Sequence, residues 1–383
     1  MKRQRASLGE LCKLVKGTSP ISKTLPGPYP LVTTGELHKT ADSFQLDAEA
    51  VCIPLISSTG HGHASLKRVH YQSGKFAIAN LLAAALVKDP SVLSPKFLTR
   101  YLNFTKDRLI VPLMTGAANM SISVDRLATV PVEFPPLAEQ ERSVKLLDEA
   151  DELRKLRAQA DHRTSALIPA LFDEMFGDPV SNPKGWPRNV LAEVCDGKSG
   201  IKAGPFGSSL KKDSYTTEGP RVYGQEQVIA GDFSVGDYHI SEAKFIEMSA
   251  YAVKPGDLLI SLVGTIGKVL IVPEGIERGI INPRLLRVRP RLSVLHPCYL
   301  EHILTSQAII SFFAGIANGV TMGVLNGGML KKLEIPLPPL AQQKEFAARV
   351  TEIRAVQAEQ ASSRLRLENL FQSMLHRAFN GDL

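Results

Sequence analysis

The chain has 383 residues, of which 44% are hydrophobic and 22% charged, and its 45 basic and 38 acidic side chains give a formal charge of +7. This length predicts at least two domains, and the composition is that of a globular protein. The longest apolar run, 76–87, is too short to cross a bilayer, and the four cysteines form no CxxC pair. The sequence therefore predicts a cytoplasmic protein and disfavours a zinc ribbon.

The first segment, residues 1–134, contains short apolar runs separated by Gly, Pro, Asn and Asp, such as YPLVTTG at 29–35. Such runs predict strands joined by turns. The stretch PKFLTRYLNF at 95–104 has the spacing of an amphipathic helix. We therefore expect an α+β domain here.

The phrase PPLAEQE at 135–141 opens a stretch of 137–168 that lacks Gly and Pro. The double proline suits a helix start, Pro169 is expected to kink or interrupt the helix, and Gly177 is expected to end it. Apolar side chains recur every seven residues, which predicts a seam for a second helix. The predicted seam residues are Leu146, Leu153, Leu156 and Leu167, and we assign 135–182 to a central helix and linker.

The second segment, 183–337, repeats the mixed pattern, with GDLLISLVGTIGKV at 256–269 as strands and turns and CYLEHILTSQAIISFFAG at 298–315 as helix. The phrase PPLAQQK at 338–344 then opens another long stretch without Gly or Pro, 340–379. We expect a C-terminal helix within 338–383. Its predicted seam residues are Val350, Ile353, Val356, Leu367 and Leu370.

The two halves form an internal repeat. The double-proline phrases begin at 135 and 338, SVLSP at 91 matches SVLHP at 293, and LGELC at 8 matches LAEVC at 191. The matches keep their order along the chain, so the sequence predicts a duplicated module of one globular head and one long helix. A pseudo-two-fold relation between the modules would make the two helices antiparallel and return the C-terminus to the first head.

These boundaries, together with FDEMFGDPVSNPKGWP at 172–187, GPFGSSLKK at 204–212 and INPRLLRVRP at 281–290, resemble the specificity subunit of type I restriction-modification enzymes. The resemblance covers essentially the whole chain. It implies two target-recognition domains that bind the two halves of a split site in double-stranded DNA. It also implies two modification subunits, which carry S-adenosylmethionine and methylate adenine, and restriction subunits that form an ATP- and Mg²⁺-dependent nuclease. The resemblance implies no catalysis by this chain and no cofactor bound to it.

Candidate DNA contacts in the second head are polar and basic residues in three stretches. Glycine-rich backbone with lysines suits phosphate, Gln suits adenine edges, and Arg suits phosphate or guanine. The candidates are Ser208, Ser209, Lys211 and Lys212; Tyr223, Gln225 and Gln227, expected at strand alternation; and Thr265, Lys268, Arg284 and Arg287. Without a role in DNA binding, the first stretch would be a surface loop, the second the rim of a sheet, and the arginines one solvated face of a strand.

Candidate contacts in the first head lie in the stretch ISSTGHGHASLK at 56–67. They are Ser57, Ser58, Thr59, His61, His63 and Lys67. The two histidines alternate and would share one face of a strand, but two ligands without a neighbouring Cys or acidic residue are too few for a zinc site. We therefore predict a polar turn that faces DNA and no metal.

Two alternatives remain beside DNA recognition. A stand-alone adenine methyltransferase would need a Pro-Pro-aromatic motif, and neither Asp178-Pro179-Val180 nor Asn182-Pro183-Lys184 supplies it. The only candidate for a Gly-rich cofactor turn is Gly264 to Gly267, which is a weak signal. A coiled-coil scaffold would explain the long helices but not the two duplicated heads.

Overall fold

The computed structural model describes residues 3–35, 39–57, 65–116, 120–206, 209–262, 267–316 and 327–380, without the side chains of 212 and 312–316. The chain divides into two compact units. Unit 1 comprises residues 1–159 and 361–383, and unit 2 comprises 160–360. Each unit therefore combines one predicted head with one end of each long helix.

The first half of the chain contains the head of unit 1 and the first long helix. Its elements are β1 (Gln4–Ser7), α1 (Leu8–Leu11), β2 (Cys12–Lys16), β3 (Tyr29–Val32), β4 (Lys39–Ala41), β5 (Leu46–Asp47), β6 (Ala50–Pro54), β7 (His70–Gln72), β8 (Lys75–Ile78), β9 (Leu82–Val87), α2 (Pro95–Leu109), η1 (Val111–Leu113), α3 (Val124–Ala128), β10 (Pro131–Phe134), α4 (Leu137–Ser165) and α5 (Leu167–Phe176). The predicted interruption is confirmed, because α4 ends four residues before Pro169. The predicted stop is confirmed as well, since Gly177 caps α5 with a φ of 77°.

The second half contains the head of unit 2 and the second long helix. Its elements are β11 (Arg188–Val190), η2 (Leu191–Glu193), β12 (Ile201–Ala203), η4 (Lys212–Ser214), β13 (Tyr215–Tyr223), α6 (Gln225–Ala230), β14 (His239–Ile240), α7 (Glu242–Glu247), η5 (Ser249–Tyr251), β15 (Leu258–Ser261), β16 (Val269–Ile271), β17 (Gly279–Ile281), β18 (Leu285–Val288), α8 (Pro297–Thr305), α9 (Gln307–Ile316), α10 (Gly327–Lys331), β19 (Glu334–Pro336) and α11 (Leu340–Asn380). The predicted C-terminal helix is confirmed almost to the residue.

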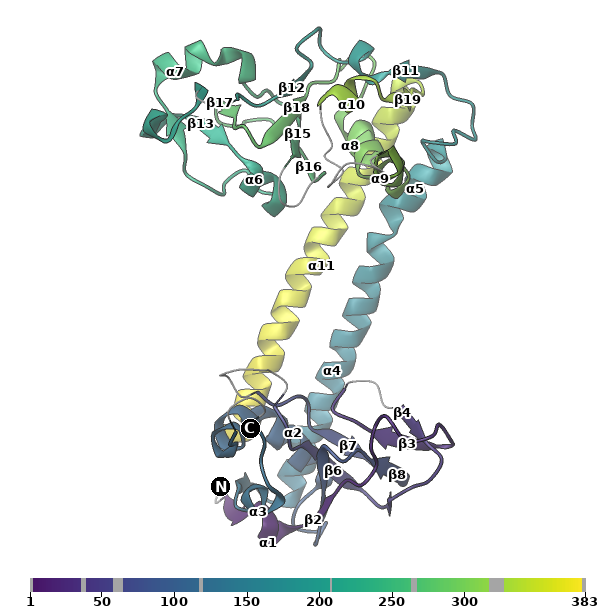
Figure 1. Cartoon of the computed structure of the whole chain (residues 1–383), viewed down its shortest axis with the longest axis vertical. Coiled ribbons are helices and arrows are strands. Elements are labelled where there is room, and N and C mark those ends of the chain that lie inside the picture. The colour runs from purple at the N-terminus through teal and green to yellow at the C-terminus, as the bar shows by residue number, and fades with distance from the viewer. Residues whose placement is uncertain are drawn as a thin grey trace. The chain divides into compact units, whose positions relative to one another are not determined.

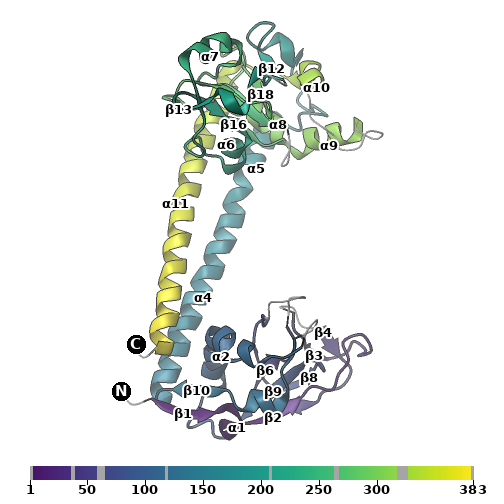
Figure 2. The ribbon, with the colours of Figure 1, turned by 60° about the vertical axis from the view of Figure 1, so that its left-hand side comes forward.

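The four-stranded sheets β2-β9-β6-β7 in unit 1 and β12-β18-β15-β16 in unit 2 have the same strand order, which confirms the internal repeat and the α+β class. A second sheet accompanies each, β4-β3-β8-β5 in unit 1 and β14-β13-β17 in unit 2, and the pairs β3–β8 and β13–β17 are both parallel. A two-stranded ladder leads into each long helix, β11-β19 in unit 2 (Figure 1) and β1-β10 in unit 1 (Figure 2).

In unit 1 the C-terminal end of α11 lies beside α4 and the N-terminal strand (Figure 2). The guanidinium of Arg3 donates to the carbonyl oxygens of Phe379 and, at 2.8 Å, Ala378. The ring of Phe379 packs at a tilt against that of Phe97 of α2, with 5.5 Å between ring centroids. The predicted return of the C-terminus to the first head is therefore confirmed.

The predicted seam of the helix pair is wrong on both helices. Leu153, Leu156 and Leu167 are 55%, 52% and 49% exposed, and Val356 and Leu370 are exposed too. Leu146, Ile353 and Leu367 are only half-buried, and Val350 is buried against the head of unit 2.

The buried face of α4 instead carries Ser143, Leu147 and Ala150 and continues into the half-buried Arg154. Arg154 bonds Glu368 of α11, and in unit 2 Gln357 donates to the carbonyl oxygen of Thr164 at 3.1 Å. The heptad spacing of the leucines does not identify the seam, because the contacts between the helices include polar side chains. Leu153 and Leu156 are exposed on α4, and Leu167 is exposed at the start of α5.

One buried glutamine joins each head to its helix. Gln140 is fully buried, accepts from the Ser94 amide at 2.9 Å, and donates to the carbonyl oxygens of Val92 and Pro135 at 2.9 and 2.8 Å. Gln343 repeats all three bonds, with the amide of His296 and the carbonyl oxygens of Val294 and Pro338, at 2.8 to 3.0 Å. The repeated phrase therefore encodes a joint, in which the glutamine satisfies backbone groups that water cannot reach.

We expect Gln343→Ala to destabilise unit 2 by about 2–4 kcal/mol, because it leaves one backbone amide and two carbonyl groups without their partner. The single tryptophan, Trp186, lies in unit 2 and reports its unfolding in urea by fluorescence. Gln342→Ala, one position earlier and only half-buried, is the matched control and is expected to change little. Equal effects of the two variants would contradict the role of the buried amide.

Candidate nucleic-acid interface

Three connections meet at one end of the larger sheet of unit 2. Ala203 at the end of β12 pairs with Leu286, and Ser261 at the end of β15 pairs with Leu285, both at the start of β18. Val269 at the start of β16 pairs with Ile260. Because neighbouring strands are antiparallel, the residues that follow β12, connect β15 to β16 and precede β18 share this end. We call it the unit-2 loop edge.

Backbone hydrogen bonds hold the three connections together. The amide of Gly204 donates to the carbonyl oxygen of Leu285 at 2.9 Å, and that of Leu262 donates to Arg284 at 3.0 Å. The Ser261 hydroxyl accepts from the amide of Lys268 at 3.1 Å. A Cβ on Gly204 would lie 1.8 Å from the carbonyl oxygen of Asn282, so this approach requires glycine.

The unit-2 loop edge gathers four of the predicted DNA contacts. Ser209 and Lys211 follow β12, Lys268 precedes β16, and Arg284 precedes β18, and all four side chains are exposed. Sequence reasoning missed Phe206 in the first connection, whose side chain is 80% exposed and is available for stacking or insertion. The predicted contacts Ser208 and Thr265 lie outside the described residues, as does the side chain of Lys212.

Three predicted contacts in this head are wrong because their side chains are buried. Tyr223 is fully buried and donates through its hydroxyl to the carbonyl oxygen of Glu277 at 2.7 Å. Gln227 accepts from the amide of Gly224 at 2.8 Å and donates to Val235 at 2.6 Å, so it caps α6. The expected strand ends at Tyr223 and gives way to α6, so the assumed alternation does not exist.

Arg287 is the third correction. Only 2% of its surface is exposed, and its guanidinium donates to the carbonyl oxygens of Ala252 at 2.5 Å and Ser199 at 2.9 Å. Burial, with Arg289 nearby, lowers the pKa of Arg287. Arg287 therefore ties the sheet to neighbouring loops and cannot reach a base. Gln225, at the start of α6, is half-exposed and remains a candidate.

The sheet of unit 1 has the equivalent edge. The amide of Gly17 donates to the carbonyl oxygen of Leu82 at 2.9 Å, and a Cβ there would lie 2.1 Å from that of Ala79, as at Gly204. The predicted contact Ser57 is half-buried, and its hydroxyl accepts from the Ser65 amide at 3.1 Å. Lys67 is exposed.

The remaining candidates of this head, Ser58, Thr59, His61 and His63, lie outside the described residues. Sequence reasoning missed Asn80, which is exposed between β8 and β9 at the place corresponding to Pro283. The repeat itself was the signal that could have found it.

The described residues offer little for covalent or metal chemistry. Burial raises the pKa of the thiols of Cys12, Cys52 and Cys195 to about 12 and that of Cys298 to about 11, so these thiols stay protonated at neutral pH. Within the described ranges, no group of three or more His, Cys, Asp and Glu side chains could hold a metal ion. In the same ranges, no helix has both the length and the apolar surface needed to span a bilayer.

Comparison with known proteins places both halves in one family. A family model described as the type I restriction modification DNA specificity domain matches residues 3–161 and 193–363. The chain belongs to the type I restriction-modification specificity family. The resemblance inferred from the sequence motifs is therefore confirmed.

Two relatives and one solved structure illustrate the spread of this family. The type I restriction enzyme EcoBI specificity subunit of Escherichia coli is 29% identical over 38% of this chain and 31% of its own length. The putative type I restriction enzyme specificity subunit S.HindORF215P of Haemophilus influenzae is 24% identical over 89% of this chain and 85% of its own. The crystal structure of the S subunit from M. genitalium matches 99% of this chain and 96% of its own with a TM-score of 0.62 and 15% identity, a likeness of fold.

We expect the double variant Lys268→Ala/Arg284→Ala to weaken binding to any duplex, because both cations stand at the unit-2 loop edge. Each lost phosphate contact should reduce the slope of log K against log salt by about 0.9, or about 1.8 for the pair. Fluorescence anisotropy on a short duplex at several salt concentrations measures this. The control is Lys254→Ala, because Lys254 is exposed and precedes β15 at the end of the sheet opposite to the loop edge. An unchanged slope in the double variant would show that the phosphate contacts lie elsewhere.

Proposed function

We propose that this chain is the DNA-recognition subunit of a type I restriction-modification system and that its two heads bind the two halves of a split DNA site. The observation that carries the proposal is the loop edge that each head repeats, with exposed cations and a glycine-dependent approach of two connections. The family membership supports it, since the matching model is named for DNA specificity. The modest net charge of +7 suits a polyanionic partner.

The same proposal assigns no catalysis to this chain. Adenine methylation then belongs to two modification subunits that bind S-adenosylmethionine, and cleavage belongs to restriction subunits that use ATP and Mg²⁺. The absence of a methyltransferase motif from the sequence favours this assignment over the alternative of a stand-alone enzyme. DNA substrate and subunits of this kind would place the protein in the cytoplasm.

Genome-wide methylation mapping tests the proposal directly. Cells that carry the chain with its modification subunits should gain adenine methylation at one bipartite sequence. Replacing residues 183–337 by the second head of another family member should change one half of that sequence and leave the other unchanged. Methyl transfer by the purified chain alone, or a change in both halves at once, would contradict the proposal.

The exposed leucines of α4 supply a surface for the modification subunits. Leu153 and Leu156 lie three residues apart on one face of the helix, where apolar side chains of this size gain most from a second helix. Two neighbouring leucines that are exposed to water in unit 1 are consistent with a surface that a partner covers.

We expect Leu153→Asp/Leu156→Asp to abolish co-purification with the modification subunits and to leave the thermal unfolding of the isolated chain unchanged. The matched control is Glu141→Ala/Lys145→Ala, two exposed polar residues four apart on the same helix. Co-purification at the wild-type level would show that the subunits bind elsewhere. A lower unfolding temperature would show instead that the leucines stabilise the chain itself.

A further inference from the structure

Unit 1 contains a groove between its head and its helix pair. Two cavities of about 650 and 640 Å³ share the residues Arg68, Arg100, Asp148, Asp151 and Arg154. Their walls come from the segment before β7, from α2, from α4 and from the C-terminal part of α11. We call this pair of cavities the unit-1 groove.

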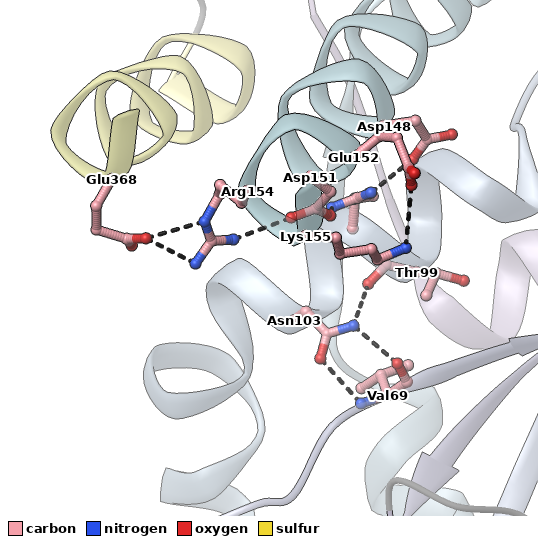
Figure 3. A network of polar contacts seen from close by, with 10 residues as sticks. Val69, Thr99, Asn103, Asp148, Asp151, Glu152, Arg154, Lys155 and Glu368 are labelled. Atoms are coloured by element: carbon pink, nitrogen blue, oxygen red, sulfur yellow. Dashed lines mark hydrogen bonds and ion pairs between the residues drawn. The ribbon is translucent and has the colours of Figure 1, made fainter. Parts of the chain in front are cut away.

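A fixed polar network forms one wall of the groove (Figure 3). The Arg100 guanidinium donates to Asp148 at 2.5 Å and also to Asp151. Arg154 bridges Asp151 at 2.9 Å and Glu368 of α11 at 2.7 Å, and Lys155 pairs with Glu152 at 3.6 Å. Every carboxylate that lines the groove therefore already has a cation, and the guanidiniums of Arg100 and Arg154 are held in place.

The groove has a surplus of positive charge. Its second cavity is lined by six cationic residues and four carboxylates. Among the described residues, Arg68 and the half-buried Arg157 make no ion pair, although both line this cavity. Two guanidiniums that have no carboxylate partner and line one cavity can each form a charge-assisted hydrogen bond with an anionic occupant.

The first cavity adds an apolar floor to this charged rim. It is lined by Phe104, Val144, Phe371 and Leu375. The guanidinium of Arg154 lies over the ring of Phe371, 4.2 Å from its centroid. The groove therefore offers an apolar contact and cationic contacts side by side.

Unit 2 shows that the fold does not require this groove. Arg100 and Leu375, which line the groove, correspond to His302 and Phe172 by the offsets of the repeat. Phe172 lies 4.3 Å from His302 and 5.5 Å from Phe346 between ring centroids. Burial lowers the pKa of His302 to about 4, so the ring is neutral at pH 7.

Unit 2 therefore packs two aromatic rings at positions where unit 1 has a guanidinium and an aliphatic side chain in the groove. Charge differs as well, because Arg157 of unit 1 corresponds to Gln360 of unit 2. The duplicated modules share their strand connectivity and their buried glutamine but differ at this place, which points to a role that only unit 1 has.

We propose that the unit-1 groove binds one segment of a partner protein in which carboxylate side chains flank an apolar side chain, once per chain. The apolar residue contacts Phe104, Phe371 and Leu375, and the carboxylates pair with Arg68 and Arg157. A DNA backbone suits the groove less well, since its phosphates make no use of an apolar floor.

The inference rests on the proposed function in one respect, because the partner is taken to be a modification or restriction subunit of the same system. The test titrates the full chain with purified modification subunit, with purified restriction subunit added to the preformed complex, and with a 30-bp duplex. The variant is Arg68→Glu/Arg157→Glu, whose side chains make no ion pair that the change would break within the described part of the chain. Gln360→Glu, at the duplicate of position 157, is the matched control.

We expect the double variant to raise the Kd for one of the two subunits at least tenfold and to unfold at the wild-type temperature. The Kd values of Gln360→Glu should equal those of the wild-type chain. Wild-type affinity of the double variant for both subunits overturns the inference, and a loss confined to the duplex assigns the groove to DNA and overturns it too. An equal loss of affinity in Gln360→Glu would show that the effect is not specific to unit 1 and would overturn the inference. Failure of the wild-type chain to bind either subunit would instead contradict the proposed function.

Discussion

The side-chain amide of a buried glutamine fixes the junction on which each half of this protein depends. Gln140 and Gln343 lie in the first turn of α4 and α11, and each bonds one amide and one carbonyl of the segment before α2 or α8. The third bond, to Pro135 or Pro338, closes the turn that starts the helix. A side chain with both a donor and an acceptor at that length is needed, so Asn, Glu or Leu would each leave part of the buried backbone unsatisfied. The glutamine joint therefore adds a directional polar contact to the apolar packing of each head on its helix.

The predictable part of this structure is the part that is set locally along the chain. Double prolines start the helices, Pro169 interrupts one and Gly177 ends it, because each acts on the backbone at its own position. The helix seam was not predictable in this way, because leucines at heptad spacing mark an apolar face but do not say which face meets the second helix. Leu147 and Ala150 pack in the core of the head, and the contacts between the helices in unit 1 include the ion pair of Arg154 with Glu368.

Local sequence patterns also predict the exposed candidate DNA contacts better than the buried ones. Lys211, Lys268 and Arg284 flank turns, and cations beside turns stay exposed whatever the fold around them. Arg287 and Tyr223 lie within or at the end of strands whose two faces are both covered, so chemistry alone could not separate them from surface residues. A charged residue in a strand was interpreted as a ligand contact, whereas here its long side chain reaches carbonyl groups of two neighbouring loops.

The two halves of a duplicated chain can be compared with each other, and the features that both halves share are those that the common fold needs. The glutamine joint, the close approaches at Gly17 and Gly204, and the order of the strands are kept. The loop edges differ in side chains, with Leu81 in one half where Arg284 stands in the other, as expected of two surfaces that bind different sequences. The helix-facing sides differ in another way: one half packs aromatic rings where the other opens a charged groove. If the loop edges bind DNA as proposed, their divergence concerns the choice of DNA. The groove lies on the side of the head that faces the helices, so its divergence from unit 2 concerns a different contact.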